Sequence, residues 1–203
     1  MRDKRKMNIY EAAVQGFRVL VYSKNDIDVV NDFLLSHYKW GVSMVDSVSE
    51  KQLEDRKEYY GNLPKLHINY AATNTLMAFV DKEQWERIES GEQTEYYIPI
   101  GIFNISRTMV SQRNDGDDTY YDFVRPFMLS AKDVQPLRLQ AAINVGRYVH
   151  KHRFIQFIMK PVNDKSKECL KLVKNVSVGV GNPAWGAKTN ESVIIVKIDE
   201  FYK

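Results

Sequence analysis

The chain has 203 residues, 44% of them hydrophobic and 27% charged, which is ordinary for a globular protein and excludes a fibrous or intrinsically disordered chain. The formal net charge of +3 hides an uneven distribution: residues 1–133 hold 17 Lys and Arg against 21 Asp and Glu, whereas residues 134–203 hold 12 against 5. Such a lopsided charge points to a polyanionic partner.

The first third of the chain predicts a strand, a helix and then a strongly charged helix. In residues 15–23, Phe17, Val19 and Val21 alternate with Arg18, Leu20 and Tyr22, as the two faces of a strand require. A helix capped by Asn25 or Asp26 follows. Residues 47–50 have the pattern of a capping box, which opens a charged helix that ends at Gly61.

The middle of the chain predicts two strands, a short helix and a long extended stretch. Apolar alternation on both sides of Thr73–Asn74 predicts two strands joined by a turn. Residues 81–84 resemble a second capping box, which opens a helix that anchors Trp85. Residues 96–112 are expected to be extended, and Pro99 argues for an edge strand or a bulge there.

The remainder of the chain predicts a hairpin, one helix and a series of strands. Residues 113–118 form a polar hairpin tip, from which residues 120–129 return as a strand. Pro136 starts a helix that reaches about Val149. The last expected strands span residues 153–160, 170–180 and 192–201.

These elements predict an α+β fold, a largely antiparallel mixed sheet of about seven to eight strands with four helices. No Pro-rich or Ser/Gly-rich linker divides the chain. Residues 1–203 are therefore expected to form a single α+β domain, with two lobes that meet near residue 130 as the alternative.

The basic charge is concentrated in residues 134–174, which hold nine Lys and Arg against two acidic residues. Within this range, residues 147–154 interleave cations with aromatic side chains, the mixture by which proteins neutralise phosphates and stack on bases. The alternative is a solvated basic face, partly explained by the preference of cations for helix C-termini. The predicted nucleic-acid-binding residues are Arg138, Arg147, Tyr148, Lys151, Arg153, Lys160, Lys171 and Lys174.

Motifs for metal binding and catalysis are weak by comparison. His150 and His152 would share a strand face, but no Asp, Glu or Cys lies nearby in register, so neither a metal site nor a cofactor is expected. Gly116–Asp118 resembles the metal-binding hairpin of viral RNA polymerases, yet the surrounding residues are typical of a solvated turn. The single Cys169 excludes a disulfide framework. Without a nucleophile elbow, a phosphate-binding loop or a zinc-protease motif, no enzyme is expected.

Aromatic residues supply the candidates for contact with a partner protein. Tyr97 and Tyr121 belong to adjacent tyrosine pairs on expected strands, and tyrosine is enriched at interfaces. Trp185 lies in the Gly- and Pro-containing loop 181–186, where its side chain either tucks into the core or inserts into a partner. The predicted interface residues are therefore Trp185, Tyr97 and Tyr121.

The sequence thus predicts a non-enzymatic, self-associating structural protein that binds nucleic acid, RNA in preference to DNA, in the manner of a viral coat, matrix or nucleic-acid-escort protein. Complementary charge within the chain favours a homo-oligomer. One alternative is a peripheral membrane protein with its basic face on anionic lipid. A small enzyme with a non-local active site is another. No apolar run approaches the roughly 20 residues that span a bilayer, so a cytoplasmic location is expected, or the host-cell cytoplasm or nucleus for a viral protein.

Overall fold

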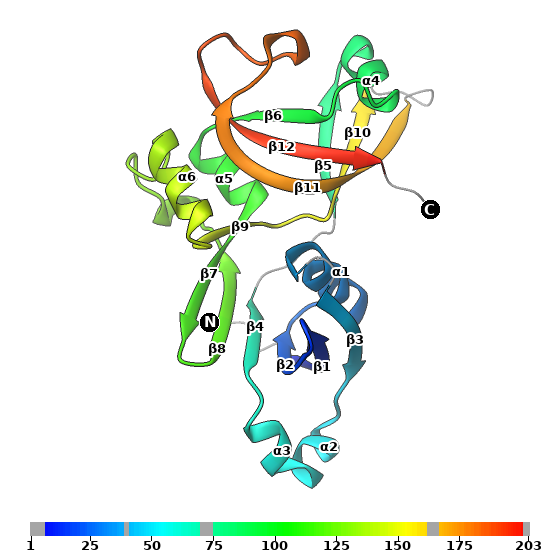
Figure 1. Ribbon diagram of the computed structural model, residues 1–203, viewed down its shortest axis with the longest axis vertical. Coiled ribbons are helices and arrows are strands. Elements are labelled where there is room, and N and C mark those ends of the chain that lie inside the picture. The colour runs from blue at the N-terminus through cyan, green and yellow to red at the C-terminus, as the bar shows by residue number, and fades with distance from the viewer. Residues whose placement is uncertain (1–6, 39–40, 70–74, 162–166, 201–203) are drawn as a thin grey trace. The chain divides into compact units, whose positions relative to one another are not determined.

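The computed structural model describes residues 7–38, 41–69, 75–161 and 167–200, and it has the predicted α+β class with largely antiparallel, mixed sheets (Figure 1). The strands are divided between two sheets. The chain forms two compact units. Unit 1 comprises residues 1–72 and 110–123, and unit 2 comprises residues 73–109 and 124–203.

Unit 1 contains a mixed sheet whose strands run in the order β3-β1-β2-β4-β8-β7. Its strands are β1 (Asn8–Val14), β2 (Phe17–Ser23), β3 (Val42–Ser47), β4 (Lys65–Asn69), β7 (Met109–Asp115) and β8 (Asp118–Phe123). Strand β4 is parallel to both β2 and β8, and the other pairs are antiparallel. The β1–β2 turn needs positive φ at Gln15 and Gly16, the geometry of a type I′ hairpin.

Helix α1 (Ile27–Tyr38) covers one face of this sheet, as its apolar spacing predicts. Its buried residues are Val30, Phe33 and Leu34, and the Phe33 ring meets the Tyr121 ring edge-on at 4.8 Å. Because these side chains recur at intervals of three and four residues, they form one apolar stripe. The helix therefore closes the core of unit 1.

The charged helix predicted after residue 47 is confirmed in part and corrected in detail. It consists of two short helices, α2 (Glu50–Asp55) and α3 (Lys57–Gly61), interrupted at Arg56. The capping box is formed by Ser49 and Gln52, two residues later than predicted, with each side chain bonded to the other residue's backbone N–H. Ser49 fits this place because it precedes the first helical residue, whereas Ser47 still belongs to β3.

Unit 2 contains a five-stranded sheet in the order β5-β10-β11-β12-β6. Its strands are β5 (Thr75–Val80), β6 (Glu95–Pro99), β10 (Phe154–Met159), β11 (Glu168–Val180) and β12 (Ser192–Glu200). Only β5 and β10 are parallel. Strand β6 is an edge strand, as Pro99 predicts.

The two strands predicted on either side of Thr73–Asn74 exist, but they do not pair with each other. Strand β4 pairs with β2 and β8 in unit 1, whereas β5 pairs with β10 in unit 2. The predicted turn itself lies outside the described residues. Alternation specifies a strand but not its partner, so this hairpin could not be read correctly from residues 66–80 alone.

Three helices of at least seven residues belong to unit 2: α4 (Lys82–Glu89), α5 (Ile102–Thr108) and α6 (Pro136–Asn144). Helix α4 confirms the prediction, because the Asp81 carboxylate accepts from the Gln84 N–H at 2.8 Å and Trp85 is buried. Helix α6 also confirms the prediction, although it ends earlier. Helix α5 corrects the extended stretch predicted over residues 96–112.

The side chains that bury α4, α5 and α6 against the sheet form one hydrophobic core in unit 2. Its fully buried members include Ile88, Ile105, Leu139, Phe157 and Ile194. Two turns of 3-10 helix, η2 (Pro126–Met128) and η3 (Pro183–Trp185), and the short strand β9 (Tyr148–His150) complete the unit. The residues predicted to bind nucleic acid all lie in this unit.

Candidate nucleic-acid interface

The two cations nearest helix α6 are brought together by the fold. Arg138 lies in the first turn of α6 and Arg147 follows its C-terminus, and both side chains are exposed. Both act on Asp133, whose pKa is lowered chiefly by hydrogen bonds from the hydroxyl and N–H of Ser130, and further by these guanidiniums. The two bonds measure 2.7 and 2.8 Å. Arg138, Arg147 and Asp133 therefore form one cluster around α6.

Tyr148 does not have the role that its position beside Arg147 predicted. Its side chain is only 6% exposed and belongs to the hydrophobic core of unit 2. The Arg147 guanidinium carbon lies 5.6 Å from the centroid of its ring. The prediction that Tyr148 stacks on bases is corrected, because its ring is almost completely buried in this core.

Lys151 and Arg153 lie on the segment that leads from β9 into β10. The Lys151 N–H donates to the Thr108 carbonyl at 2.9 Å, and the Arg153 carbonyl accepts from the Val173 N–H at 2.8 Å. Partial burial lowers the pKa of the Lys151 ammonium, because desolvation disfavours its charged form. The Arg153 guanidinium carbon is 5.2 Å from the Phe154 ring centroid.

Lys171 and Lys174 are both engaged within unit 2. Lys171 is 4% exposed, and its ammonium donates at 3.4 Å to the carbonyl of Glu89, the last residue of α4. A cation there complements the negative end of the helix, so the prediction that Lys171 binds nucleic acid is wrong. Lys174 pairs with Asp199 at 2.5 Å on the neighbouring strand.

Lys160 lies at the far end of β10 from Arg153. It is exposed, and its N–H donates to the Val80 carbonyl at 2.8 Å. Seven residues of extended chain separate the two by roughly 20 Å. The predicted basic face is therefore not one continuous surface: Arg138, Arg147, Lys151 and Arg153 follow one path from α6 to β10, and Lys160 stands apart.

Two exposed cations that sequence reasoning missed precede the predicted range. Arg125 lies just before η2, with its guanidinium carbon 5.9 Å from the Phe127 ring centroid, and Lys132 lies between η2 and α6. The signal that could have found Arg125 is its spacing from an aromatic residue, the pattern that singled out Arg147–Phe154. Arg125 was missed because the predicted basic range began at residue 134, a limit chosen from counts of charged residues.

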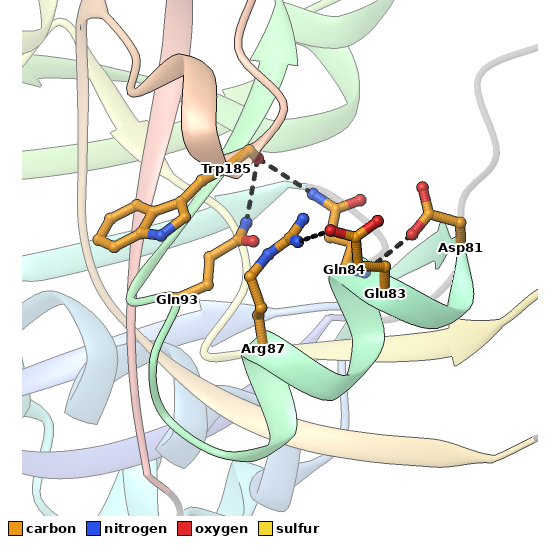
Figure 2. A network of polar contacts seen from close by, with 6 residues as sticks. All are labelled: Asp81, Glu83, Gln84, Arg87, Gln93 and Trp185. Atoms are coloured by element: carbon orange, nitrogen blue, oxygen red, sulfur yellow. Dashed lines mark hydrogen bonds and ion pairs between the residues drawn. The ribbon is translucent and has the colours of Figure 1, made fainter.

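The predicted interface residue Trp185 is held against α4 by a polar network. Figure 2 shows its carbonyl oxygen facing the side-chain amides of Gln84 and Gln93, each of which donates at 3.4 Å. On the same helix, the Arg87 guanidinium donates to the Glu83 carboxylate at 2.6 Å. The loop is thus attached through its backbone, while the indole ring stays half-buried.

The two predicted interface tyrosines differ in exposure. The hydroxyl of Tyr97 donates to the Glu95 carboxylate at 2.9 Å and accepts from the Asn182 N–H at 3.0 Å. Burial and this carboxylate raise the pKa of Tyr97 to about 12. Tyr121 is fully buried, with its hydroxyl 2.9 Å from that of Tyr38. Its predicted contact role is therefore wrong, because it fills the core of unit 1.

The candidate metal ligands are also placed by the structure. A ring nitrogen of His152 lies 2.8 Å from the Arg107 carbonyl oxygen. At the β7–β8 hairpin, the Asp118 carboxylate lies 3.9 Å from the Lys65 ammonium and 3.6 Å from the His67 ring nitrogen. No cluster of three or more His, Cys, Asp or Glu side chains that could hold a metal occurs among the described residues.

Within the part of the chain that the structure describes, no helix is both long enough and apolar enough to cross a membrane. Comparison of this chain with protein-family models, with curated proteins and with solved structures gives no match.

Proposed function

We propose that this protein is a non-enzymatic, self-associating structural protein of the cytoplasm that binds single-stranded nucleic acid, RNA in preference to DNA. The observation that supports it most is the composition of residues 124–161, which hold seven Lys and Arg and a single carboxylate, Asp133. That carboxylate accepts two hydrogen bonds from Ser130. The surface from α6 to β10 is therefore positive and offers donors to phosphates.

The arginines on this surface combine charge with planar support. Arg147 and Arg153 each lie beside an aromatic ring, and this contact restricts the guanidinium. Arginine forks match the geometry of phosphate oxygens. A backbone that runs from Arg138 past Arg147 to Arg153 would meet three such groups.

Charge reversal tests the proposal. Arg138→Glu, Arg147→Glu and Arg153→Glu together should abolish binding of a labelled single-stranded RNA, measured by fluorescence anisotropy at low salt. For the unaltered protein, the slope of log affinity against log salt should be about −0.7 for each phosphate contact. A single-stranded DNA of the same sequence measures the preference for RNA.

The matched control reverses three exposed lysines elsewhere, Lys51, Lys57 and Lys82, so that the net charge changes equally. This control should keep most of the affinity, because the lost cations lie on α2, α3 and α4. An equal loss of RNA affinity in both triple variants would show that binding depends on net charge alone and not on this surface. Absence of binding by the unaltered protein at about 50 mM salt would end the proposal.

A further inference from the structure

Four bulky apolar side chains protrude from neighbouring elements of unit 2. Phe103 of α5 is 77% exposed, Phe127 and Met128 of η2 are 80% and 69% exposed, and Leu137 of α6 is 87% exposed. Helix α5 contacts η2, and only residues 129–135 separate η2 from α6. We call these four residues the apolar tip. Scattered single apolar residues are normal on a surface, but four on adjoining elements call for a partner.

The local structure explains why these side chains point outward. In α5 and α6, the residue two positions later, Ile105 and Leu139 respectively, is almost completely buried. Two residues correspond to about 200° of helical rotation, so Phe103 and Leu137 lie on the opposite side. In η2, the Met128 N–H donates to the Arg125 carbonyl, and Leu129 packs against the core. The tip is therefore held by buried neighbours.

Cations flank the residues of the apolar tip along the chain. Arg125, Lys132 and Arg138 are all exposed and lie within or beside the three elements that carry it. The single carboxylate of this region, Asp133, accepts hydrogen bonds from Ser130 and lies in the field of Arg138. The surroundings of the tip thus attract anions.

The chemistry of the tip distinguishes between classes of partner. Met128 and Leu137 are aliphatic and have no ring face on which a base could stack. All four side chains are at least 69% exposed, so they are available to enter an apolar phase. Protruding apolar groups flanked by Lys and Arg are the arrangement with which peripheral proteins enter the interface of an anionic bilayer. We propose that the apolar tip docks unit 2 on an anionic lipid surface, a role beyond nucleic-acid binding.

Vesicle sedimentation tests this proposal. The full chain should co-sediment with phosphatidylcholine vesicles that contain phosphatidylserine and should remain in solution with pure phosphatidylcholine. Phe127→Ser with Leu137→Ser should weaken vesicle binding about a hundredfold, roughly tenfold for each apolar side chain that no longer enters the lipid. Both positions are exposed, so thermal unfolding should be unchanged and should verify that the variant is folded.

Phe17→Ser is the matched control, because Phe17 is 72% exposed at the β1–β2 hairpin of unit 1 and lies outside the tip. It should bind vesicles as the unaltered protein does. RNA affinity, measured in parallel, should be unchanged in the Phe127→Ser, Leu137→Ser variant and lost in the variant with three arginines reversed. This difference separates the two proposals.

Three results would overturn the lipid proposal. The first is equal vesicle binding by the double variant and the unaltered protein. The second is no binding of the unaltered protein to vesicles that contain phosphatidylserine. The third is an effect of the double substitution in the absence of vesicles. A lower oligomeric mass would assign the tip to a contact with a second copy, and a loss of RNA affinity would assign it to nucleic acid.

Discussion

At the scale of single residues, burial decides which cations are available to a ligand. The sequence shows Lys171, Lys174 and Arg138 alike as basic residues. In the structure, however, Lys171 donates to the last carbonyl of α4 and Lys174 pairs with Asp199. Arg138 stays exposed on α6. Lys151 is intermediate between these cases, because its side chain is half-buried and desolvation lowers its pKa.

Lys151→Met tests whether this lysine serves binding at some expense of stability. The pKa of Lys151 is lower in the folded than in the unfolded protein, so its positive charge destabilises the folded state at neutral pH. This destabilisation disappears as the pH rises through the folded and then the unfolded pKa. Methionine keeps the apolar stem. The free energy of unfolding at neutral pH should therefore be unchanged or higher, while RNA affinity should fall and the salt slope should shrink by about 0.7.

Chemical denaturation and anisotropy measure the two effects. Lys160→Met serves as the control, because Lys160 is exposed and stands apart from the α6–β10 path. It should change neither quantity much. A clear loss of stability in Lys151→Met would contradict the assignment of desolvation as the dominant effect.

At the scale of elements, capping matters in proportion to what the helix buries. Helix α4 begins at the Asp81 cap, buries Trp85 and Ile88, and carries the Gln84 amide that faces the Trp185 carbonyl (Figure 2). Helix α2 has a complete capping box at Ser49 but buries no side chain. The two helices allow the same change to be compared in different tertiary settings.

Asp81→Ala should lower the free energy of unfolding of unit 2 by about 1 kcal/mol, because the Gln84 N–H loses its acceptor and α4 is part of the core. Ser49→Ala removes a similar bond but should affect mainly the local opening of α2. Denaturant unfolding measures the first effect, and amide hydrogen exchange of α2 measures the second. A global loss of equal size in both variants would contradict this distinction.

At the scale of the whole molecule, the charge division of the sequence does not coincide with the two units. Unit 1 holds 12 Lys and Arg against 14 Asp and Glu, and unit 2 holds 17 against 12. Residues 81–95, on and after α4, contain six acidic residues and two basic ones. Figure 1 shows α4 and α6 at opposite ends of unit 2. The α4 segment is therefore acidic and the α6 segment basic, although Lys167 and Lys171 also contact α4.

This polarity leads to a prediction about self-association. The basic α6 end of one copy should attract the acidic α4 end of another, a head-to-tail contact that salt screens. Light scattering after size exclusion should give a mass above 23.7 kDa at low salt that falls toward 23.7 kDa as salt rises. A mass that does not depend on salt would exclude this mode of assembly.

Local signals in the sequence predicted much of the fold and little of the site. The Asp81 cap, the stripe of Val30, Phe33 and Leu34, the polar hairpin tip and Pro136 all act within a few residues of themselves. Helix α5 escaped prediction because a short apolar run such as Ile102–Ile105 has no distinctive period. Arg138 and Arg147 were identified from composition, but their common partner Asp133 was not.

The sequence by itself determined the α+β class, the position of most elements and the basic character of the C-terminal third, since caps, turns and periodicity depend on neighbours along the chain. Only the tertiary structure decided that β4 and β5 belong to different sheets, that Lys171, Tyr148 and Tyr121 are buried, and that the apolar tip protrudes. Pairing and burial depend on residues distant in the sequence, so no local pattern encodes them.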